Sequence, residues 1–198
     1  MRIIGVTGPS GSGKSMLSKY LEKNGFAVID ADELYHSMLI PPSPCLDAIK
    51  ETFGGEVIAP DGSLNRAALS AIVFNSPEKL KLLNNTVLSL VLENVRLLIS
   101  QFEAQGKDTV IVDAPTLIES GFNLECHTVI SVIAPTEARI LRICQRDGIT
   151  KEKATERVRA QKDDGFYISH SDEVIYNSST AKEFTHRIQE LCLKLGLA

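Results

Sequence analysis

The fold is decided by the stretch Gly8-Pro9-Ser10-Gly11-Ser12-Gly13-Lys14-Ser15, which follows an apolar run at residues 3–6. It has the spacing of two glycines, a lysine and a hydroxyl residue that marks a loop between a strand and a helix. Glycines let successive N–H groups point inward as an anion nest, and the following helix adds the positive end of its dipole. The lysine supplies a charge for the β- and γ-phosphates, and the hydroxyl can ligate Mg²⁺. The stretch therefore predicts a phosphate-binding loop.

The alternative interpretation of this motif is a glycine-rich turn with an exposed lysine. That alternative lacks the apolar strand before the motif and the helical stretch at residues 14–23 after it, and both are present here. We therefore expect the loop to bind ATP together with Mg²⁺. The residues expected to contact the nucleotide are Gly8, Ser10, Gly11, Ser12, Gly13, Lys14, Ser15 and Met16.

The composition fits a soluble globular protein. Of the 198 residues, 43% are hydrophobic and 23% are charged, and the formal net charge is -4. A nucleic-acid-binding domain normally carries a basic stripe, so this balance argues against nucleic acid as a partner. The four cysteines stand far apart without a CxxC pair, which favours reduced thiols over a zinc site or a disulfide framework.

No export or membrane segment is predicted. The apolar run at the N-terminus is too short for a signal peptide, and no stretch approaches the length needed to span a bilayer. We expect a cytoplasmic protein that acts on small molecules without a membrane partner, as a monomer or a homo-oligomer.

Five short apolar runs, each followed by turn or polar residues, indicate buried strands. Runs of this length that are rich in Val and Ile and separated by helical stretches are typical of parallel strands. With the phosphate loop, they predict an α/β protein of the P-loop NTPase class, with helices on both faces of a five-stranded parallel sheet (three layers, α/β/α). The runs are residues 3–6, 26–29, 110–112, 129–133 and 174–176.

The interval between the second and third runs is too long for one crossover connection. It contains Ser76 and Pro77, a good start signal for a helix with Ser as the N-cap and Pro in the first turn. Apolar residues then recur at helical spacing. We expect an inserted helical lobe at residues 33–104, beside a core formed by residues 1–32 and 105–198.

Carboxylates follow two predicted strands at the edge where open α/β sheets bind their ligands. Asp30-Ala31-Asp32 ends the second strand, and Asp113 ends the third. An acceptor hydroxyl loses a proton as it takes a phosphoryl group, so one Asp of the pair is a candidate base and the other a helix cap; two caps are the alternative. Asp113 ends an apolar strand as a Walker B aspartate does, where it would bind Mg²⁺; turn chemistry is the alternative.

Three arginines share one face of a predicted helix, because Arg139, Arg142 and Arg146 are three and four residues apart. Such a stripe is usually solvated surface. Here no acidic residue interleaves from Arg139 to Arg146, so we expect an anion to lie against at least one of them. An arginine that reached a transferring phosphoryl group would stabilise its negative charge.

Six segments carry a further pattern in their order and spacing: Ile4-Gly-Val-Thr-Gly8 through Ser15, Val28-Ile-Asp-Ala-Asp32, Gly62-Ser-Leu-Asn65-Arg66, Asp113-Ala-Pro115-Thr-Leu117-Ile-Glu119, Arg146-Asp147-Gly148 with Arg157-x-x-Ala160-Gln161, and Asp172-Glu-Val-Ile-Tyr-Asn177. Together they resemble the dephospho-CoA kinase family over nearly the whole chain. Apart from the phosphate loop, no single segment is specific.

The resemblance implies transfer of the ATP γ-phosphate to the ribose 3′-hydroxyl of dephospho-CoA, giving coenzyme A. It implies that Asp32 activates this hydroxyl and that the helical lobe, with Asn65 and Arg66, receives the acceptor. Ser15 and Asp113 would hold the metal ion.

The resemblance also assigns the phosphate end of the site. It implies that Lys14 and Arg142 hold the phosphates, that Arg146 acts from a lid at about residues 142–165, and that Asn177 lies near the adenine.

Two positions depart from the family pattern. Met16 stands where the family often has Thr, and Leu88-Ser89 stands where it commonly has His-Pro. The alternatives to a dephospho-CoA kinase are a P-loop kinase for another nucleoside or nucleotide, and an ATP-binding paralogue with weakened catalysis. A guanine-specific switch is disfavoured, because no Asn-Lys-x-Asp motif follows the fourth strand.

Overall fold

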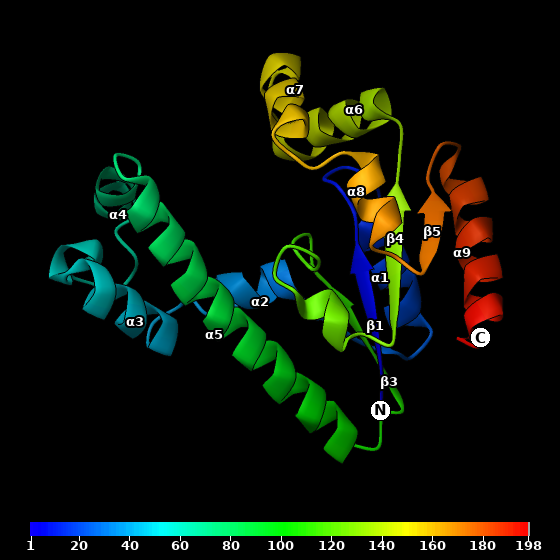
Figure 1. Cartoon of the computed structure of the whole chain (residues 1–198), viewed down its shortest axis with the longest axis horizontal. Helices are drawn as coiled ribbons and strands as arrows, with labels where there is room; N and C mark the ends of the chain where they lie inside the picture. The colour runs from blue at the N-terminus through cyan, green and yellow to red at the C-terminus, as the bar shows by residue number, and fades with distance from the viewer. Residues whose placement is uncertain (198) are drawn as a thin grey trace. The chain divides into compact units, whose positions relative to one another are not determined.

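The computed structural model describes residues 1–197 and contains one five-stranded sheet (Figure 1). Its strands lie in the order β2-β3-β1-β4-β5, and β1 pairs in parallel with both β3 and β4, as β4 does with β5. The predicted P-loop fold with a five-stranded parallel sheet is confirmed. The strands are β1 (Arg2–Thr7), β2 (Ala27–Asp30), β3 (Thr109–Asp113), β4 (Thr128–Ile133) and β5 (Glu173–Tyr176).

Helices cover both faces of this sheet. On one face, α1 (Lys14–Lys23) and α9 (Ala181–Leu195) pack over a core that includes Val6, Val132 and Phe184. Successive residues of a strand point to opposite faces, so Ile133 faces the other side, where it meets Tyr167 of α8 (Asp164–Ser169). The three layers of the predicted architecture follow from this alternation.

A pair of helices follows β4 and leads back towards β5. These are α6 (Thr136–Asp147) and α7 (Lys151–Arg159), and they share a small apolar core of Ile140, Ile143 and Ala154. A short 3₁₀ helix, η2 (Phe122–Glu125), connects β3 to β4. That the α6–α7 pair acts as a lid remains a prediction.

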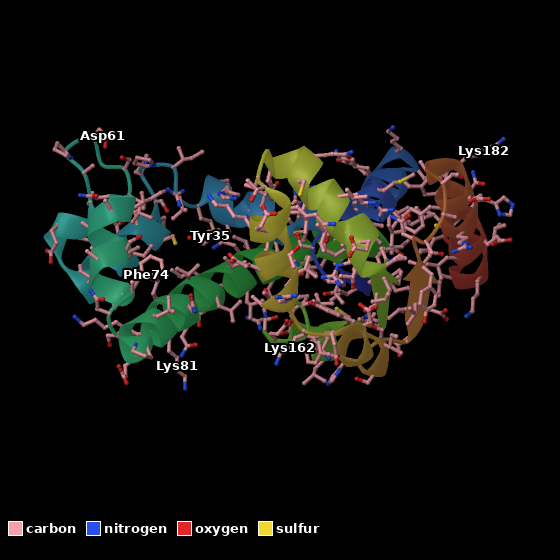
Figure 2. The ribbon with its side chains drawn as sticks, turned by 90° about the horizontal axis from the view of Figure 1, so that it is seen from above. Tyr35, Asp61, Phe74, Lys81, Lys162 and Lys182 are labelled. Atoms are coloured by element: carbon pink, nitrogen blue, oxygen red, sulfur yellow. The ribbon has the colours of Figure 1, made fainter. Side chains whose placement is uncertain are left out.

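The chain divides into two compact units, residues 1–29 with 101–198, and residues 30–100. The second unit has its own core, which includes Leu46, Ile49 and Val57, while Phe74 at the end of α4 stays 78% exposed (Figure 2). That this unit receives an acceptor remains a prediction. It contains α2 (Ala31–Ser37), α3 (Pro44–Phe53), η1 (Gly55–Val57), α4 (Arg66–Val73) and most of α5 (Pro77–Ala104).

Helix α5 corrects one expectation. It has 28 residues, and an 18-residue window within it reaches a mean hydropathy of 1.3 with 11% of that window buried. By length and composition alone it is therefore long and apolar enough to cross a bilayer, contrary to the expectation from sequence. The reason is that uncharged Asn, Thr and Ser interrupt its Leu and Val residues without making the average polar. One such helix is weak evidence for a membrane span, since helices of soluble proteins pass the same test.

Candidate active site

The phosphate loop leaves β1, the central strand, and leads directly into α1. Gly13 precedes the helix with φ of 110°, and a Cβ atom there would stand 2.3 Å from Nδ2 of Asn177. Both the left-handed conformation and the close approach require glycine. Lys14 begins α1, and its Nζ donates a hydrogen bond to the carbonyl oxygen of Gly8 at 2.8 Å. The loop thus closes on itself over the positive end of a ten-residue helix.

A cavity of about 440 Å³ lies against this loop. The cavity lies between the loop and α6, because Arg142 and Arg146 of α6 line it together with residues of the phosphate loop. These side chains are cationic or polar, and the helix end adds positive potential, so the cavity suits an anion. Its lining residues are Gly11, Gly13, Lys14, Ser15, Arg142, Gln145 and Arg146.

Arg142 reaches the backbone of the phosphate loop. Its Nη1 donates to the carbonyl oxygens of Gly11, at 3.1 Å, and Ser12, at 3.3 Å. In a planar trans peptide the N–H points opposite to the C=O. Arg142 therefore fixes the next two N–H groups, of Ser12 and Gly13, so that they point away from its guanidinium.

Asn177 completes this arrangement from the end of β5. It is buried, its Nδ2 donates to the carbonyl oxygen of Ser12 at 2.8 Å, and its Oδ1 accepts from Nη2 of Arg142 at 3.2 Å. The side chain therefore joins the loop to Arg142. The position of Asn177 near an adenine remains a prediction.

Arg146 lies one turn further along α6 and is largely exposed. It donates to both carboxylate oxygens of Asp147, at 2.7 and 3.1 Å, and to Oγ of Ser10 at 3.4 Å. Arg157 of α7 also pairs with Asp147. The hydrogen bond from Arg146, together with Arg157, lowers the pKa of the Asp147 carboxyl below its usual value.

Asp113 ends β3 beside α1. It is buried, and its Oδ2 accepts a hydrogen bond from Oγ of Ser18 at 2.6 Å, while the Ser15 side chain, one turn earlier on α1, is exposed. Within residues 1–197 no group of three or more His, Cys, Asp or Glu side chains could hold a metal ion. Mg²⁺ in phosphoryl-transfer sites takes only one or two protein oxygens besides phosphates and water, so a serine hydroxyl and one carboxylate fit this ion.

The family of the chain follows from comparison with known proteins. A family model described as dephospho-CoA kinase matches residues 2–183. The chain belongs to the dephospho-CoA kinase family. The dephospho-CoA kinase of Carboxydothermus hydrogenoformans is 34% identical, over 97% of this chain and 93% of that protein, and the one of Shouchella clausii is 36% identical, over 93% of each.

Solved structures agree with this family. The protein TT1252 from Thermus thermophilus superposes with a TM-score of 0.81 and 31% identity, covering 98% of this chain and 96% of that one. A dephospho-CoA kinase from Campylobacter jejuni gives a TM-score of 0.72 and 25% identity, covering 98% of both chains. A shikimate kinase from Acinetobacter baumannii, with 16% identity and a TM-score of 0.56, shares the fold alone.

The acceptor-side residues expected of a dephospho-CoA kinase belong to the helical unit and are described within it. Asp30 is the N-cap of α2, where its Oδ1 accepts from the N–H groups of Asp32 and Glu33 at 2.9 and 3.0 Å. Of the two aspartates that the sequence could not separate, Asp30 is thus the cap, and Asp32 is exposed in the first helical turn.

Asn65 also has a structural part. Its Oδ1 caps α4 by accepting from the N–H of Ala68 at 3.1 Å, and its Nδ2 donates to the carbonyl oxygen of Glu56 at 3.3 Å. Arg66 follows it at the start of α4 and is exposed. That Asp32, Asn65 and Arg66 contact an acceptor remains a prediction.

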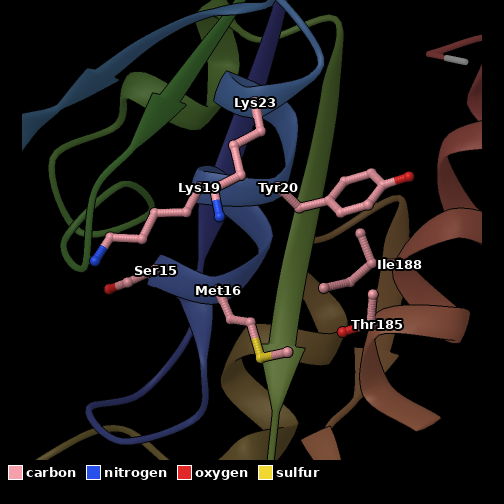
Figure 3. Close-up of a pocket in the computed structure, with 7 residues that line it drawn as sticks. All are labelled: Ser15, Met16, Lys19, Tyr20, Lys23, Thr185 and Ile188. Carbon is pink, nitrogen blue, oxygen red and sulfur yellow. The ribbon is translucent and has the colours of Figure 1, made fainter. Parts of the chain in front are cut away.

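Met16, at the position where dephospho-CoA kinases often have Thr, lies away from the arginine-lined cavity. Figure 3 shows the Ser15 hydroxyl and the Met16 thioether pointing to different sides of α1. Met16 lines a second cavity of about 430 Å³ between α1 and α9, together with Tyr20, Thr185 and Ile188, and it packs partly on the sheet core. Ser15 borders both cavities.

Arg139 and Gln161 also touch the phosphate loop, although the sequence assigned Gln161 no role and offered Arg139 only as one of three arginines that could meet an anion. Arg139 was expected to share an uncompensated cationic face; instead it is buried and bonded to Ser10, Gln161 and Asp164. Spacing along one helix shows which side chains share a face. It carries no signal for partners that come from distant segments.

Proposed function

We propose that the protein transfers the γ-phosphoryl group of ATP to the ribose 3′-hydroxyl of dephospho-CoA, giving coenzyme A and ADP. One observation carries this proposal: the phosphate loop, Lys14, Arg142 and Arg146 converge on one cavity in a member of the dephospho-CoA kinase family. The cavity supports the binding of the ATP phosphates, and membership of the family supports dephospho-CoA as the acceptor.

The phosphate end works by electrostatic stabilisation. Loop N–H groups fixed by Arg142 would bind phosphate oxygens, and Lys14 would exchange its bond to the Gly8 carbonyl for the β- and γ-phosphates. Arg146, which already borders the cavity, would add charge where the phosphoryl group passes. Negative charge spreads over the equatorial oxygens in such a transfer, so fixed cations lower its barrier.

Ser15 and Asp113 would hold Mg²⁺, the Ser15 hydroxyl directly and the Asp113 carboxylate through water. When bound, this ion neutralises charge on the β- and γ-phosphates. Asp113 is tied to Ser18 by a hydrogen bond of 2.6 Å, which keeps its carboxylate beside α1.

Asp32 would orient the 3′-hydroxyl and accept its proton. The freed oxygen then forms a bond to the γ-phosphorus, the bond from that phosphorus to the bridging oxygen breaks, and ADP leaves with the electron pair. Asn65 and Arg66 would contact the acceptor, and Asn177 the adenine. The α6–α7 lid would exclude water, since water would otherwise take the phosphoryl group.

The setting of this activity is also a proposal. The net charge of -4 and the family support small-molecule partners in the cytoplasm, without nucleic acid or a membrane. The chain would work as a monomer or a homo-oligomer.

The test is an ADP-release assay with purified protein, Mg-ATP and one acceptor at a time. We expect rapid release with dephospho-CoA and little with AMP, CMP, shikimate or pantothenate. A higher rate with another acceptor would reassign the substrate. Nucleotide binding without turnover of any acceptor would indicate a paralogue with lost catalysis, in line with Leu88-Ser89 at the His-Pro position.

A further inference from the structure

The tip of the phosphate loop is held from both sides of one residue. The carbonyl oxygen of Ser10 accepts from Nε of Arg139 at 3.1 Å, and the N–H of Ser10 donates to Oε1 of Gln161 at 3.2 Å. Nη2 of Arg139 donates to the same oxygen of Gln161 at 2.8 Å. Ser10, Arg139 and Gln161 thus form a closed ring of three hydrogen bonds, which we call the tip clamp.

Arg139 is committed to this position. Only 3% of the residue is exposed, and burial lowers the pKa of its guanidinium although Asp164, 3.7 Å away, opposes that effect. A buried cation is tolerated only when its donors are bonded. The loop also lies directly on α6, because a Cβ atom at Gly11 would stand 2.7 Å from the carbonyl oxygen of Arg139.

Gln161 is held in place from the sheet. It lies between α7 and α8, and Asp163, two residues on, caps α8 by accepting from the N–H of Phe166 at 2.8 Å. Lys162 lies over the Phe166 ring, with its Nζ 5.3 Å from the ring centroid. The buried Tyr167 then fastens α8 to β4. The Gln161 oxygen therefore comes from a segment that is fixed to the sheet on one side and continues into α7 on the other.

The clamp extends a pattern that Arg142 begins. Arg139 donates to the carbonyl oxygen of Ser10. Arg142, one turn later on α6, donates to those of Gly11 and Ser12. Since the N–H of each planar peptide points opposite to its C=O, the next three N–H groups along the loop all point away from α6. The N–H of Ser12 donates to the carbonyl oxygen of Pro9 at 3.2 Å, so this orientation presents the N–H groups of Gly11 and Gly13 to an anion nest.

We propose that Arg139 and Gln161 are positioning residues that set the phosphate loop for ATP, with Gln161 linking the end of α7 to the loop tip. This inference rests on the proposed function, since it needs ATP to bind at the loop. Neither side chain is required to touch the nucleotide. Both act through the Ser10 peptide.

The test replaces Gln161 by Met, which keeps the length of the side chain but removes the acceptor. We expect Gln161→Met to raise the Kd of Mg-ATP in calorimetry, and the KM for ATP, about tenfold, as for one lost hydrogen bond of typical strength. The KM for dephospho-CoA should stay within about twofold, because general loosening would move both constants. Gln161→Glu retains an acceptor oxygen and should recover most of the loss. Gln189→Met, on the exposed face of α9, is the matched control.

A second variant guards against failure to fold. Arg139→Lys keeps the charge but replaces the two nitrogens that donate to Ser10 and Gln161 by a single one, which loses the planar fork, so we expect the same ATP-specific loss. Combining it with Gln161→Met should give less than the product of the two single effects, since they share one oxygen atom.

The outcomes separate the inference from the function. If the unmodified protein binds Mg-ATP and turns over dephospho-CoA, while both variants match it or bind ATP more tightly, the tip clamp has no positioning role. If the unmodified protein binds no nucleotide, the proposed function fails and the inference fails with it.

Discussion

The phosphate loop and the helical unit differ in how their predicted site residues are held by the rest of the protein. Around the loop, the side chains of Arg142 in α6 and of Asn177, directly after β5, hold backbone carbonyls, so the backbone expected to bind phosphate is preorganised. In the helical unit, Asn65 serves a helix end, and Asp32 lies exposed beside the cap that Asp30 forms. The backbone of the loop is therefore fixed by side chains of the protein itself, whereas a role of Asp32 and Asn65 in binding an acceptor remains a prediction. Each prediction below tests that contrast.

The largest effect is expected at Lys14. Lys14→Ala removes the mobile charge of the phosphate grip and should lower kcat by about 10³-fold or more, as loss of a charged stabilising group does. Unfolding should stay cooperative, because the hydrogen bonds from Nζ to the carbonyl oxygens of Gly8 and Pro9 stay within the loop. Lys182→Ala, an exposed lysine of the same unit, is the control for steady-state kinetics and thermal unfolding (Figure 2). A variant that no longer unfolds cooperatively would make Lys14 a structural residue.

The pair Asp30 and Asp32 gives the next effect. Asp32→Asn should lower kcat by about 10²–10⁴-fold, the range for a lost general base, and leave the Kd of ATP unchanged. Asp30→Asn should change little, since Asn caps a helix as well as Asp does. Single-turnover rates and ATP titrations of both variants provide the measurement. A larger loss for Asp30→Asn would reverse the two assignments.

The sequence could predict what is encoded within a few residues. The glycine spacing of the loop encodes its path, Ser76-Pro77 encodes the start of α5, and the capping box of Thr180 and Glu183 encodes the start of α9. Each depends on neighbours along the chain, and the strands follow from apolar runs in the same way.

Contacts between distant segments could not be predicted in this manner. The tip clamp joins Arg139 to Ser10 and Gln161, which are far from it in the chain. From the α6 sequence alone, the positive charges of this helix face therefore looked uncompensated. Asp30 and Asp32 both sit at a strand-to-helix turn, and spacing cannot tell which carboxylate turns back to the N–H groups. Only the three-dimensional structure distinguishes the two aspartates.

A smaller effect separates capping from substrate contact at Asn65. Asn65→Ala should cost about 1 kcal/mol of folding free energy through loss of the α4 cap, whereas Asn65→Asp should keep the cap. If Asn65 also meets the anionic acceptor, Asn65→Asp should raise the KM for dephospho-CoA severalfold without changing the KM for ATP. Denaturant unfolding and steady-state kinetics measure the two. Thr180→Ala removes a cap in the other unit and serves as the control, with stability loss alone. An unchanged acceptor KM for Asn65→Asp would limit Asn65 to capping.

The smallest effect concerns Asp147, which binds Arg146 and Arg157 in place of an external anion. Its pKa is lowered in the folded protein, so its contribution to stability is present above about pH 4 and is lost as the pH falls through the lowered pKa. Asp147→Asn should thus lower the melting temperature by about 2 °C or less at pH 7, as for an exposed ion pair, and the difference should shrink as the pH falls through the lowered pKa.

If Arg146 binds ATP as proposed, the Asp147 carboxylate competes with the nucleotide for it. Asp147→Asn removes the charge of this competing carboxylate and should then lower the KM for ATP, by about threefold or less for an exposed pair. Asp61→Asn removes another exposed carboxylate with a lowered pKa, bonded only to Ser63 among the contacts described, and should leave that KM unchanged (Figure 2). A raised KM for Asp147→Asn would mean that Asp147 orients Arg146 towards ATP. The preorganisation seen at the loop backbone would then extend to the side chains above it.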